Sequence, residues 1–220
     1  MVTSGPQQNP SEAGGKRIAG VILAGGRSSR MGGGEKGLLD LGGRTLLQHV
    51  ADRLAPQVDT VALNSNGEPE FFVSLGVPVV ADTLSDRQGP LAGVLTGMIW
   101  ARSQNRFSDL VTVTCDTPFF PADLTARLLA ARRRDSDVVI AASNGRDHPV
   151  FGLWSLGLEE KLAHFLKAQS DRSVMAFIRN CGYVSVSFDF IRCGDQSVDP
   201  FFNINTPRDM TEAARYIDMA

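Results

Sequence analysis

Short apolar runs of strand length alternate with segments of helical periodicity from residue 17 to residue 143. Parallel neighbouring strands need a crossover connection, and a helix provides it, so this alternation favours repeated βαβ units. We therefore expect an α/β fold with a doubly wound, Rossmann-like, mostly parallel sheet and helices on both faces. The strand-like runs are residues 17–23, 59–64, 77–82, 109–116 and 136–143, and the helix-like segments are residues 45–55, 69–76, 89–104 and 121–134.

The regular alternation loosens after Pro149, although strand-like and helix-like segments continue. No linker-like stretch separates this part from the rest, so we expect one domain over residues 17–220. Residues 1–16 are polar and rich in Gly, Pro and Gln, and we expect them to form a disordered leader. The later strands are expected at residues 150–154 and 183–188, and the later helices at residues 156–168, 173–181 and 206–217.

Composition excludes several classes of protein. With 220 residues and a net charge of −2, the chain lacks the positive charge of a general nucleic-acid-binding protein. Its three cysteines are an odd number without a CxxC pair, which fits neither a disulfide framework nor a zinc site. No apolar run approaches the ~20 residues that span a bilayer. We expect a cytoplasmic protein without nucleic-acid or membrane partners.

Polar or glycine-rich residues follow four of the predicted strands. The first strand runs into the sequence LAGG, and the next three end near Asn64, Asp82 and Asp116. In open parallel sheets, ligands bind beyond the carboxyl ends of the strands. The convergence predicts a polar ligand site at this edge of the sheet.

The loop at residues 23–36 reads LAGGRSSRMGGGEK. Its glycines allow the backbone N–H groups to approach phosphate oxygens, and Arg27, Arg30 and Lys36 supply cations that stabilise phosphoryl charge. A merely flexible surface loop is the alternative. The phosphate-loop pattern GxxxxGK[ST] is absent from this stretch.

Three polar residues at strand ends each have two interpretations. Asp116 is well placed to hold Mg²⁺, or it only begins a turn before Pro118. The carboxylate of Asp82 matches the paired N1–H and exocyclic amine of guanine, or it only begins a loop. Asn64 binds a base or sugar, or it caps a turn.

Other polar residues are weaker candidates. Cys115 is expected to pack beside the site, and His148 either touches substrate or forms a turn before Pro149. Asn203 and Asn205 would face the same side of a strand and suit a polar ligand, although Asn205 also suits a helix cap before Pro207. His49 and His164 lie in helical patterns and are interpreted as structural.

These motifs together resemble a known family. The stretch LAGGRSSRMGGGEKGLLDLGGRTLLQHV at residues 23–50 resembles the signature of nucleotidyltransferases that activate a phosphorylated acceptor. Four further stretches resemble, in the same order, the molybdenum cofactor guanylyltransferase (MobA) family, and the resemblance covers about residues 17–217. They are GPLAGVL at 89–95, CDTPFFPADL at 115–124, RDHPV at 146–150 and FFNINTP at 201–207.

The resemblance implies a Rossmann-like nucleotidyltransferase fold and an enzyme that uses GTP with Mg²⁺. Such an enzyme transfers GMP to the terminal phosphate of molybdenum-loaded molybdopterin and releases pyrophosphate. The implied protein partners are transient ones, namely proteins that deliver molybdopterin and proteins that mature molybdoenzymes. The acceptor is already a phosphate, so the absence of an obvious nucleophile–base pair is consistent with this reaction.

The resemblance also implies roles for individual residues. Lys36, Asp116 and Arg30 would be catalytic, and Asp116 would ligate the metal. Glu35 stands where the family usually has Asp before the lysine. The implied GTP contacts are Leu23, Ala24, Gly25, Lys36, Asn64, Asp82 and Asp116, and the implied pterin contacts are Arg30, Asn203 and Asn205.

Three alternatives remain open at this point. A CTP-dependent enzyme that builds the cytosine form of the cofactor is the nearest, although its relatives typically carry LAAG where this chain has LAGG. A cytidylyl- or sugar-nucleotidyltransferase of the same fold is more distant, because RDHPV and NINTP argue against it. A non-catalytic GTP-binding carrier would bind the nucleotide without releasing pyrophosphate.

Overall fold

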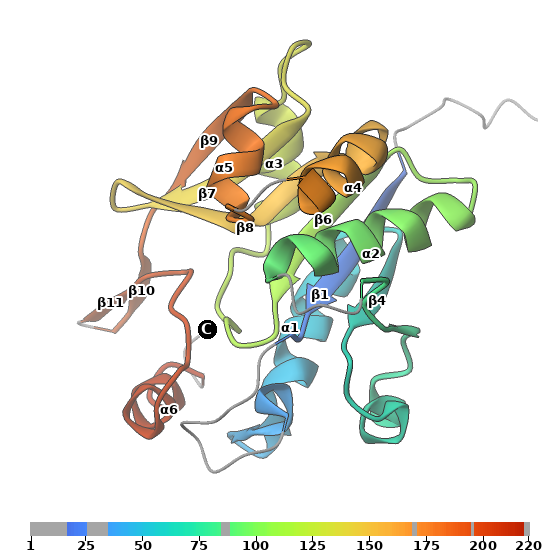
Figure 1. Ribbon diagram of the computed structural model, residues 1–220. Helices are drawn as coiled ribbons and strands as arrows, with labels where there is room; N and C mark the ends of the chain where they lie inside the picture. The colour runs from blue at the N-terminus through green and yellow to red at the C-terminus, as the bar shows by residue number, and fades with distance from the viewer. Residues whose placement is uncertain (1–16, 26–34, 85–88, 169–170, 195, 218–220) are drawn as a thin grey trace, which may run out of the picture.

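The computed structural model describes residues 17–25, 35–84, 89–168, 171–194 and 196–217, and it contains a seven-stranded sheet (Figure 1). Every neighbouring pair is parallel except the two pairs that include β8, so the prediction of a mostly parallel sheet is confirmed. In spatial order the strands are β5 (Val79–Val80), β4 (Thr60–Asn64), β1 (Ile18–Leu23), β6 (Asp109–Thr114), β8 (Arg146–Ser155), β7 (Val138–Ser143) and β9 (Tyr183–Phe188).

Helices cover both faces of this sheet, as the sequence predicts. On one face lie α2 (Pro90–Ser103), α4 (Glu159–Ala168) and α5 (Val174–Arg179), and their apolar side chains form one buried cluster with the sheet. On the other face lie α1 (Leu46–Leu54) and α3 (Leu124–Ala131), which contribute to a second cluster. The strands between two such layers are buried on both faces, which explains their continuous apolar runs.

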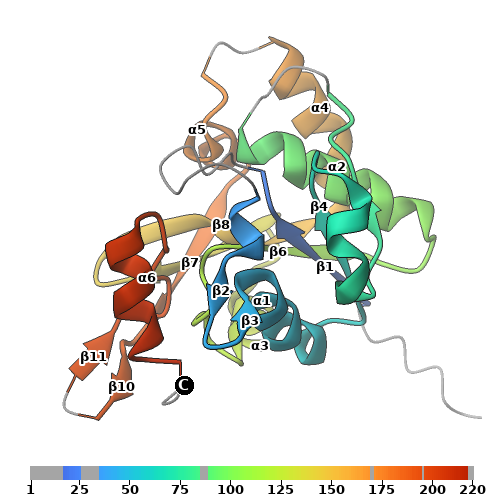
Figure 2. The same ribbon diagram turned by 90° about the horizontal axis from the view of Figure 1, so that it is seen from below.

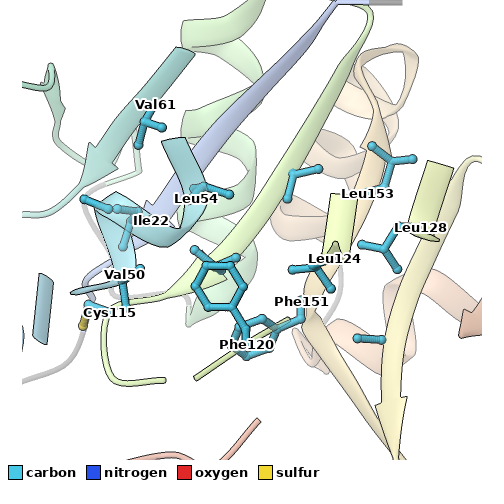
Figure 3. Packing of buried hydrophobic residues seen from close by; sticks show 14 of the residues in the cluster. Ile22, Val50, Leu54, Val61, Cys115, Phe120, Leu124, Leu128, Phe151 and Leu153 are labelled. Carbon is cyan, nitrogen blue, oxygen red and sulfur yellow. The ribbon is translucent and has the colours of Figure 1, made fainter. Parts of the chain in front are cut away.

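The second cluster shows how these elements are held together. In Figure 3 the ring of Phe120 lies beside that of Phe151, between side chains of α1 such as Leu54 and side chains of α3 such as Leu124, and the two ring centroids are 6.2 Å apart. Removing a large side chain from such a packed region typically costs about 3–5 kcal/mol. The packing fixes the strand ends that carry the candidate site.

A third apolar cluster lies beyond the sheet and involves α6 (Pro207–Ala214). Tyr216 and Ala213 pack there with Leu41 and Leu46, and Figure 2 shows α6 beside β2 (Asp40–Leu41). The C-terminal part of the chain is thereby fixed next to the segment that follows the glycine-rich loop. Two hairpins in this region were not predicted, β2 with β3 (Arg44–Thr45) and β10 (Ile191–Cys193) with β11 (Gln196–Val198).

Short 3₁₀ helices complete the described elements, and one of them replaces a predicted helix. The predicted helix at 69–76 is a 3₁₀ helix over Pro69–Leu75, and its C-cap is Gly76, whose φ of 64° suits glycine. The 3₁₀ helices are η1 (Lys36–Leu38), η2 (Ala55–Gln57), η3 (Pro69–Leu75) and η4 (Leu156–Leu158).

Three local predictions are wrong. The strand predicted at 150–154 starts earlier, at Arg146, so His148 lies in a strand and not in a turn; a bulge between the β7 pairs of Ile140 and Ala141 accommodates Pro149. Asn203 and Asn205 do not lie on a strand. The helix predicted from Pro121 begins at Leu124.

Two predictions stay untested. The leader at residues 1–16 lies outside the described residues, and the single-domain assignment of residues 17–220 stays a prediction. Within the part of the chain that the structure describes, no helix is long and apolar enough to cross a membrane.

Candidate active site

A cavity of about 790 Å³ lies at the carboxyl ends of the parallel strands, which is within the usual size range of small-molecule sites. Every described residue to which the resemblance assigns a role lines it, whereas His148, a weaker candidate for substrate contact, does not. Arg30, and with it Arg27, lies outside the described residues. The predicted residues that line the cavity are Leu23, Ala24, Gly25, Lys36, Asn64, Asp82, Asp116, Asn203 and Asn205.

Sheet register brings the first of these residues together. Leu23 pairs with Asn64 of β4 on one side and with Thr114 of β6 on the other. The Ala24 amide donates to the Asn64 carbonyl at 2.9 Å, and the Cys115 amide donates to the Leu23 carbonyl at 3.1 Å. The backbone that follows β1 is therefore held between two neighbours as it enters the glycine-rich loop.

Lys36 is the centre of a polar cluster in the cavity. Its Nζ donates to Asp116 Oδ2 at 2.5 Å, to Asn205 Oδ1 at 2.6 Å and to Asn203 Oδ1 at 3.4 Å. The side chains of Lys36 and Asp116 are 13% and 14% exposed, so water screens this ion pair only partly. Thr114 Oγ1 donates to the other oxygen of Asp116, Oδ1, at 2.8 Å and fixes the carboxylate plane.

The asparagine segment reaches Lys36 from the far end of the chain. The Ile204 amide donates to the Asp116 carbonyl at 2.9 Å, and Ile204 itself is buried in the third cluster. The interpretation of Asn205 as a helix cap is wrong, because Thr206 is the N-cap of α6 and accepts from the Asp209 amide. The amide oxygen of Asn205 is instead directed at Lys36.

A second polar network surrounds Asp82. Asn64 Nδ2 donates to one carboxylate oxygen of Asp82 at 2.9 Å, and Asn66 Nδ2 donates to the other at 2.8 Å. The Asp82 amide donates back to Asn66 Oδ1 at 2.8 Å, so these two residues are paired reciprocally. Each carboxylate oxygen keeps a second lone pair for a ligand. Asn66, which sequence reasoning missed, follows β4 by two residues and was not distinguishable from a turn asparagine.

The N-terminal turn of α2 closes another side of the cavity through Gly89, Pro90 and Gly93. A Cβ at position 93 would lie 2.3 Å from Asn64 Oδ1 and 2.8 Å from Leu23 Cδ2. The helix can therefore approach the strand ends this closely only with glycine here. Its N-terminus also directs the positive end of the helix dipole toward the cavity.

Glu35 lies in the cavity wall beside Gly67. A Cβ at position 67 would lie 2.6 Å from Glu35 Oε1. The carboxylate of Glu35 is thus accommodated by a glycine across the cavity wall. Ser65 and Thr114 complete the polar lining that sequence reasoning did not single out.

Cys115 lies directly before Asp116 and is buried. Burial, followed by the nearby charge of Asp116, raises the pKa of the Cys115 thiol far above its ordinary value. The raised pKa favours the neutral thiol, which is a poor nucleophile. This geometry agrees with its interpretation as a packing residue.

The donor set restricts which metal the cavity suits. The described residues contain no group of three or more His, Cys, Asp or Glu side chains that converge on one point. They do bring one carboxylate, Asp116, together with the amide oxygens of Asn203 and Asn205. Mg²⁺ prefers oxygen ligands and keeps waters and substrate phosphates in its shell, so these residues suit that ion and not a zinc site.

A mostly parallel sheet with a glycine-lined polar cavity at its strand ends is typical of α/β proteins that bind nucleotides. Residues 20–182 match the family model described as the MobA-like NTP transferase domain. The chain is 46% identical over 201 residues to a molybdenum cofactor guanylyltransferase of Mesorhizobium japonicum, covering 91% of this chain and 96% of that protein. It is 45% identical to a protein of the same name from Rhizobium leguminosarum bv. trifolii, with 91% and 93% covered.

A solved structure supports the same fold. Molybdopterin-guanine dinucleotide biosynthesis protein A from Archaeoglobus fulgidus superposes with a TM-score of 0.69 at 20% identity, over 92% of this chain and all of that one. The chain is thus a nucleotidyltransferase by fold and domain. It belongs to the molybdenum cofactor guanylyltransferase family.

Proposed function

We propose that this protein transfers GMP from GTP to the terminal phosphate of molybdenum-loaded molybdopterin and releases pyrophosphate. The observation that carries the proposal is the meeting of Lys36, Asp116, Asn203 and Asn205 in one strand-end cavity. These residues come from three distant segments, and a lysine beside a carboxylate suits a phosphoryl reaction centre. Membership in the family supports the choice of substrates.

The cavity suggests a division of roles along its length. On the nucleotide side we place Leu23, Ala24 and Gly25, together with Asn64 and Asp82. Asp82 would accept from N1–H and the exocyclic amine of guanine, because each of its oxygens keeps a free lone pair beside the asparagine contacts. On the acceptor side we place Arg30, Asn203 and Asn205.

The reaction needs positioning and charge neutralisation rather than a base. An oxygen of the acceptor phosphate forms a bond to the α-phosphorus of GTP while the bond to the bridging oxygen breaks and pyrophosphate leaves. The acceptor oxygen is already anionic, so no proton has to be removed from it at neutral pH. Lys36 would donate to phosphate oxygens and stabilise the charge that develops on them.

Lys36 and Asp116 must exchange partners for this to happen. In the structure they neutralise one another. Asp116, beside the amide oxygens of Asn203 and Asn205, would hold Mg²⁺, which supplies positive charge to the triphosphate when it is bound. Lys36 is then free to donate to the phosphates, and the Nδ2 groups of the two asparagines remain as donors toward the acceptor.

Two other functions follow from the same cavity and are less well supported. A CTP-dependent transfer would leave the carboxylate of Asp82 without the two guanine donors. A GTP-binding carrier would need neither the lysine nor the carboxylate at the phosphate end. We further expect a cytoplasmic protein that has transient contacts with proteins that supply molybdopterin and with proteins that mature molybdoenzymes.

The test follows the label of GTP. With GTP labelled at the α-phosphate, the label should appear in a pterin-linked dinucleotide, and with GTP labelled at the γ-phosphate it should appear in pyrophosphate. Labelled GDP or inorganic phosphate without a dinucleotide would contradict the proposal. Retention of unchanged GTP on the protein would favour the carrier.

A further inference from the structure

A further polar cluster consists of Ser143, His148 and Asp199. None of these three side chains lines the cavity. Ser143, at the end of β7, is fully buried. Its Oγ lies 2.7 Å from His148 Nε2 and donates to the two carboxylate oxygens of Asp199 at 2.8 and 2.9 Å. The three side chains come from β7, from β8 and from the segment that follows β11.

The order of the protons in this cluster follows from its donors. The serine hydroxyl has one hydrogen, which Asp199 accepts. His148 Nε2 must therefore carry the proton that it donates to Ser143 Oγ. This order differs from that of a hydrolytic triad, in which histidine takes the serine proton. The cluster is a fixed chain of hydrogen bonds rather than a nucleophile.

The bulge in β8 places His148 in this chain. Ile140 pairs with Gly152, but the next residue, Ala141, pairs with His148, so Pro149, Val150 and Phe151 bulge out of the ladder. A bulge re-aims the side chains on either side of it. His148 thereby reaches Ser143 on the neighbouring strand.

Asp199 begins the segment that carries the two cavity asparagines. Its Oδ1 accepts from the Phe201 amide at 2.9 Å, and its carbonyl accepts from the Phe202 amide at 2.9 Å. The His148 ring stacks on Phe201 with the ring centroids 4.6 Å apart. Phe201 also packs on Phe151 at 5.0 Å. Both the polar and the aromatic contacts of His148 thus hold the same segment.

We propose that Ser143, His148 and Asp199 are positioning residues for the nucleotidyl transfer, because they fix the segment 199–205 so that Asn203 and Asn205 face Lys36. The proposal rests on the proposed function and extends it to residues outside the cavity. A displacement of about 1 Å at a reaction centre can reduce the rate on the order of 100-fold, even when the altered residue is distant.

The experiment compares Ser143→Ala with a matched control, Ser185→Ala. Ser185 also donates to an aspartate, Asp147 at 2.6 Å, but on the exposed face of β9 and away from the asparagine segment. We expect Ser143→Ala to lower kcat/KM for the molybdopterin acceptor on the order of 10- to 100-fold, with the Kd for GTP within about twofold of wild type. Ser185→Ala should leave both unchanged. Equal behaviour of the two variants would overturn the proposal.

A double-mutant cycle with Asn205→Ala separates positioning from general destabilisation. If the cluster acts through the asparagine segment, Ser143→Ala should lower kcat/KM little in a protein that already lacks the Asn205 amide. Full additivity of the two losses in kcat/KM would contradict an action through the asparagine segment.

Variants of His148 test the same proposal if Ser143→Ala does not fold. His148→Gln keeps an N–H donor and should retain most of the activity that His148→Leu loses, whereas equal loss would contradict the role of the donor.

Hydrogen exchange provides a readout that does not depend on the reaction. Amides of residues 199–206 should exchange faster in Ser143→Ala than in wild type, while the amides of α2 keep their rates. Unchanged exchange of the amides of residues 199–206 would overturn the proposal that the cluster holds this segment. If Ser143→Ala exchanges faster than wild type in residues 199–206, but wild type shows no transfer with GTP and molybdopterin, the proposed function fails. The role of the cluster in holding the asparagine segment then still stands.

Discussion

At the scale of single residues, the pairing of Lys36 with Asp116 is the feature on which the chemistry depends. Two groups of opposite charge lie at 2.5 Å in a cavity wall, and each has a further partner, Asn205 for the lysine and Thr114 for the aspartate. The neighbouring groups hold both side chains where phosphates are expected. Once Mg²⁺ and the triphosphate replace this ion pair, the same neighbours keep the two side chains in place for the charge that develops.

The charge of Asp116 can be removed with almost no change of shape. Asp116→Asn keeps an oxygen that can accept from Thr114 Oγ1. We expect kcat to fall on the order of 100- to 1000-fold, because a metal ligand and the partner of Lys36 are lost together. Steady-state kinetics measure this loss, and a thermal melt serves as the folding control. A variant that folds and retains near wild-type kcat would contradict the assignment of Asp116 as a metal ligand.

The carboxylate of Asp82 should recognise the base. In Asp82→Asn one of the two acceptor oxygens becomes a donor, so the exocyclic amine of guanine loses its partner. We expect wild type to prefer GTP over ITP, which lacks this amine, by on the order of 10- to 100-fold, as a hydrogen bond to a charged group is worth about 1.5–3 kcal/mol. The preference should nearly disappear in Asp82→Asn. Competition between the two nucleotides measures it, and an unchanged ratio would show that Asp82 does not contact the amine.

At the scale of elements, the close approach of α2 to β4 depends on one missing side chain. A methyl group at position 93 would lie 2.3 Å from Asn64 Oδ1, so Gly93→Ala must displace the asparagine that holds Asp82. We expect a stability loss of about 1–3 kcal/mol and a raised KM for GTP. Urea unfolding and kinetics measure the two effects.

Gly157→Ala is the matched control for this variant. Gly157 lies in the 3₁₀ helix η4, and its added methyl group would meet only Ser155 Oγ at 3.5 Å, an ordinary contact. The control should change stability and KM little. If Gly93→Ala behaves in the same way, the approach of α2 does not restrict the position of Asn64.

The pairing of β7 and β8 around the bulge should be sensitive to pH. Burial lowers the pKa of His148, partly opposed by Asp199, while the nearby charges of Arg146 and Asp147 have smaller, opposite effects. The unfolded chain therefore binds this proton more readily than the folded protein, beginning near the ordinary pKa of about 6.5. Stability from this group is present above that pH and is lost as the pH falls through the folded pKa.

The comparison of wild type with His148→Gln isolates this effect. As pH falls from 7.5 to 5.5, the unfolding free energy of wild type should decrease more steeply than that of the variant, by at most about 1.4 kcal/mol per pH unit. Urea unfolding at each pH provides the values. Parallel decreases in the two proteins would show that His148 does not titrate in this range.

At the scale of the whole molecule, apolar patterning predicted the layers of the fold but neither the two short hairpins nor the direction of β8. The buried runs of β1 and β6 and the helical spacing of α1 and α2 are local properties, so they are visible in the sequence. The hairpins β2–β3 and β10–β11 have strands of two or three residues, too short for a period to appear. The direction of β8 depends on its neighbours, which a local pattern does not encode.

The candidate site was predicted to a similar extent. Residues at strand ends, such as Asn64 and Asp116, could be found because the parallel sheet brings those ends together. Asn66 and Ser143 could not, since their importance arises from partners far along the chain, Asp82 and Asp199. The strand predicted for Asn203 and Asn205 was wrong. Both side-chain amides nevertheless reach Lys36, because the backbone amide of Ile204 between them donates a hydrogen bond to the Asp116 carbonyl.

The central claim is that this cavity joins GMP to a phosphorylated pterin. The most direct test is pyrophosphate release from GTP and, separately, from CTP, with Mg²⁺ present and with or without molybdenum-loaded molybdopterin. We predict release from GTP only, dependent on the acceptor and equal in amount to the dinucleotide formed. Release from CTP would contradict the base assignment, and release from neither nucleotide, in protein that binds GTP, would contradict the transfer itself.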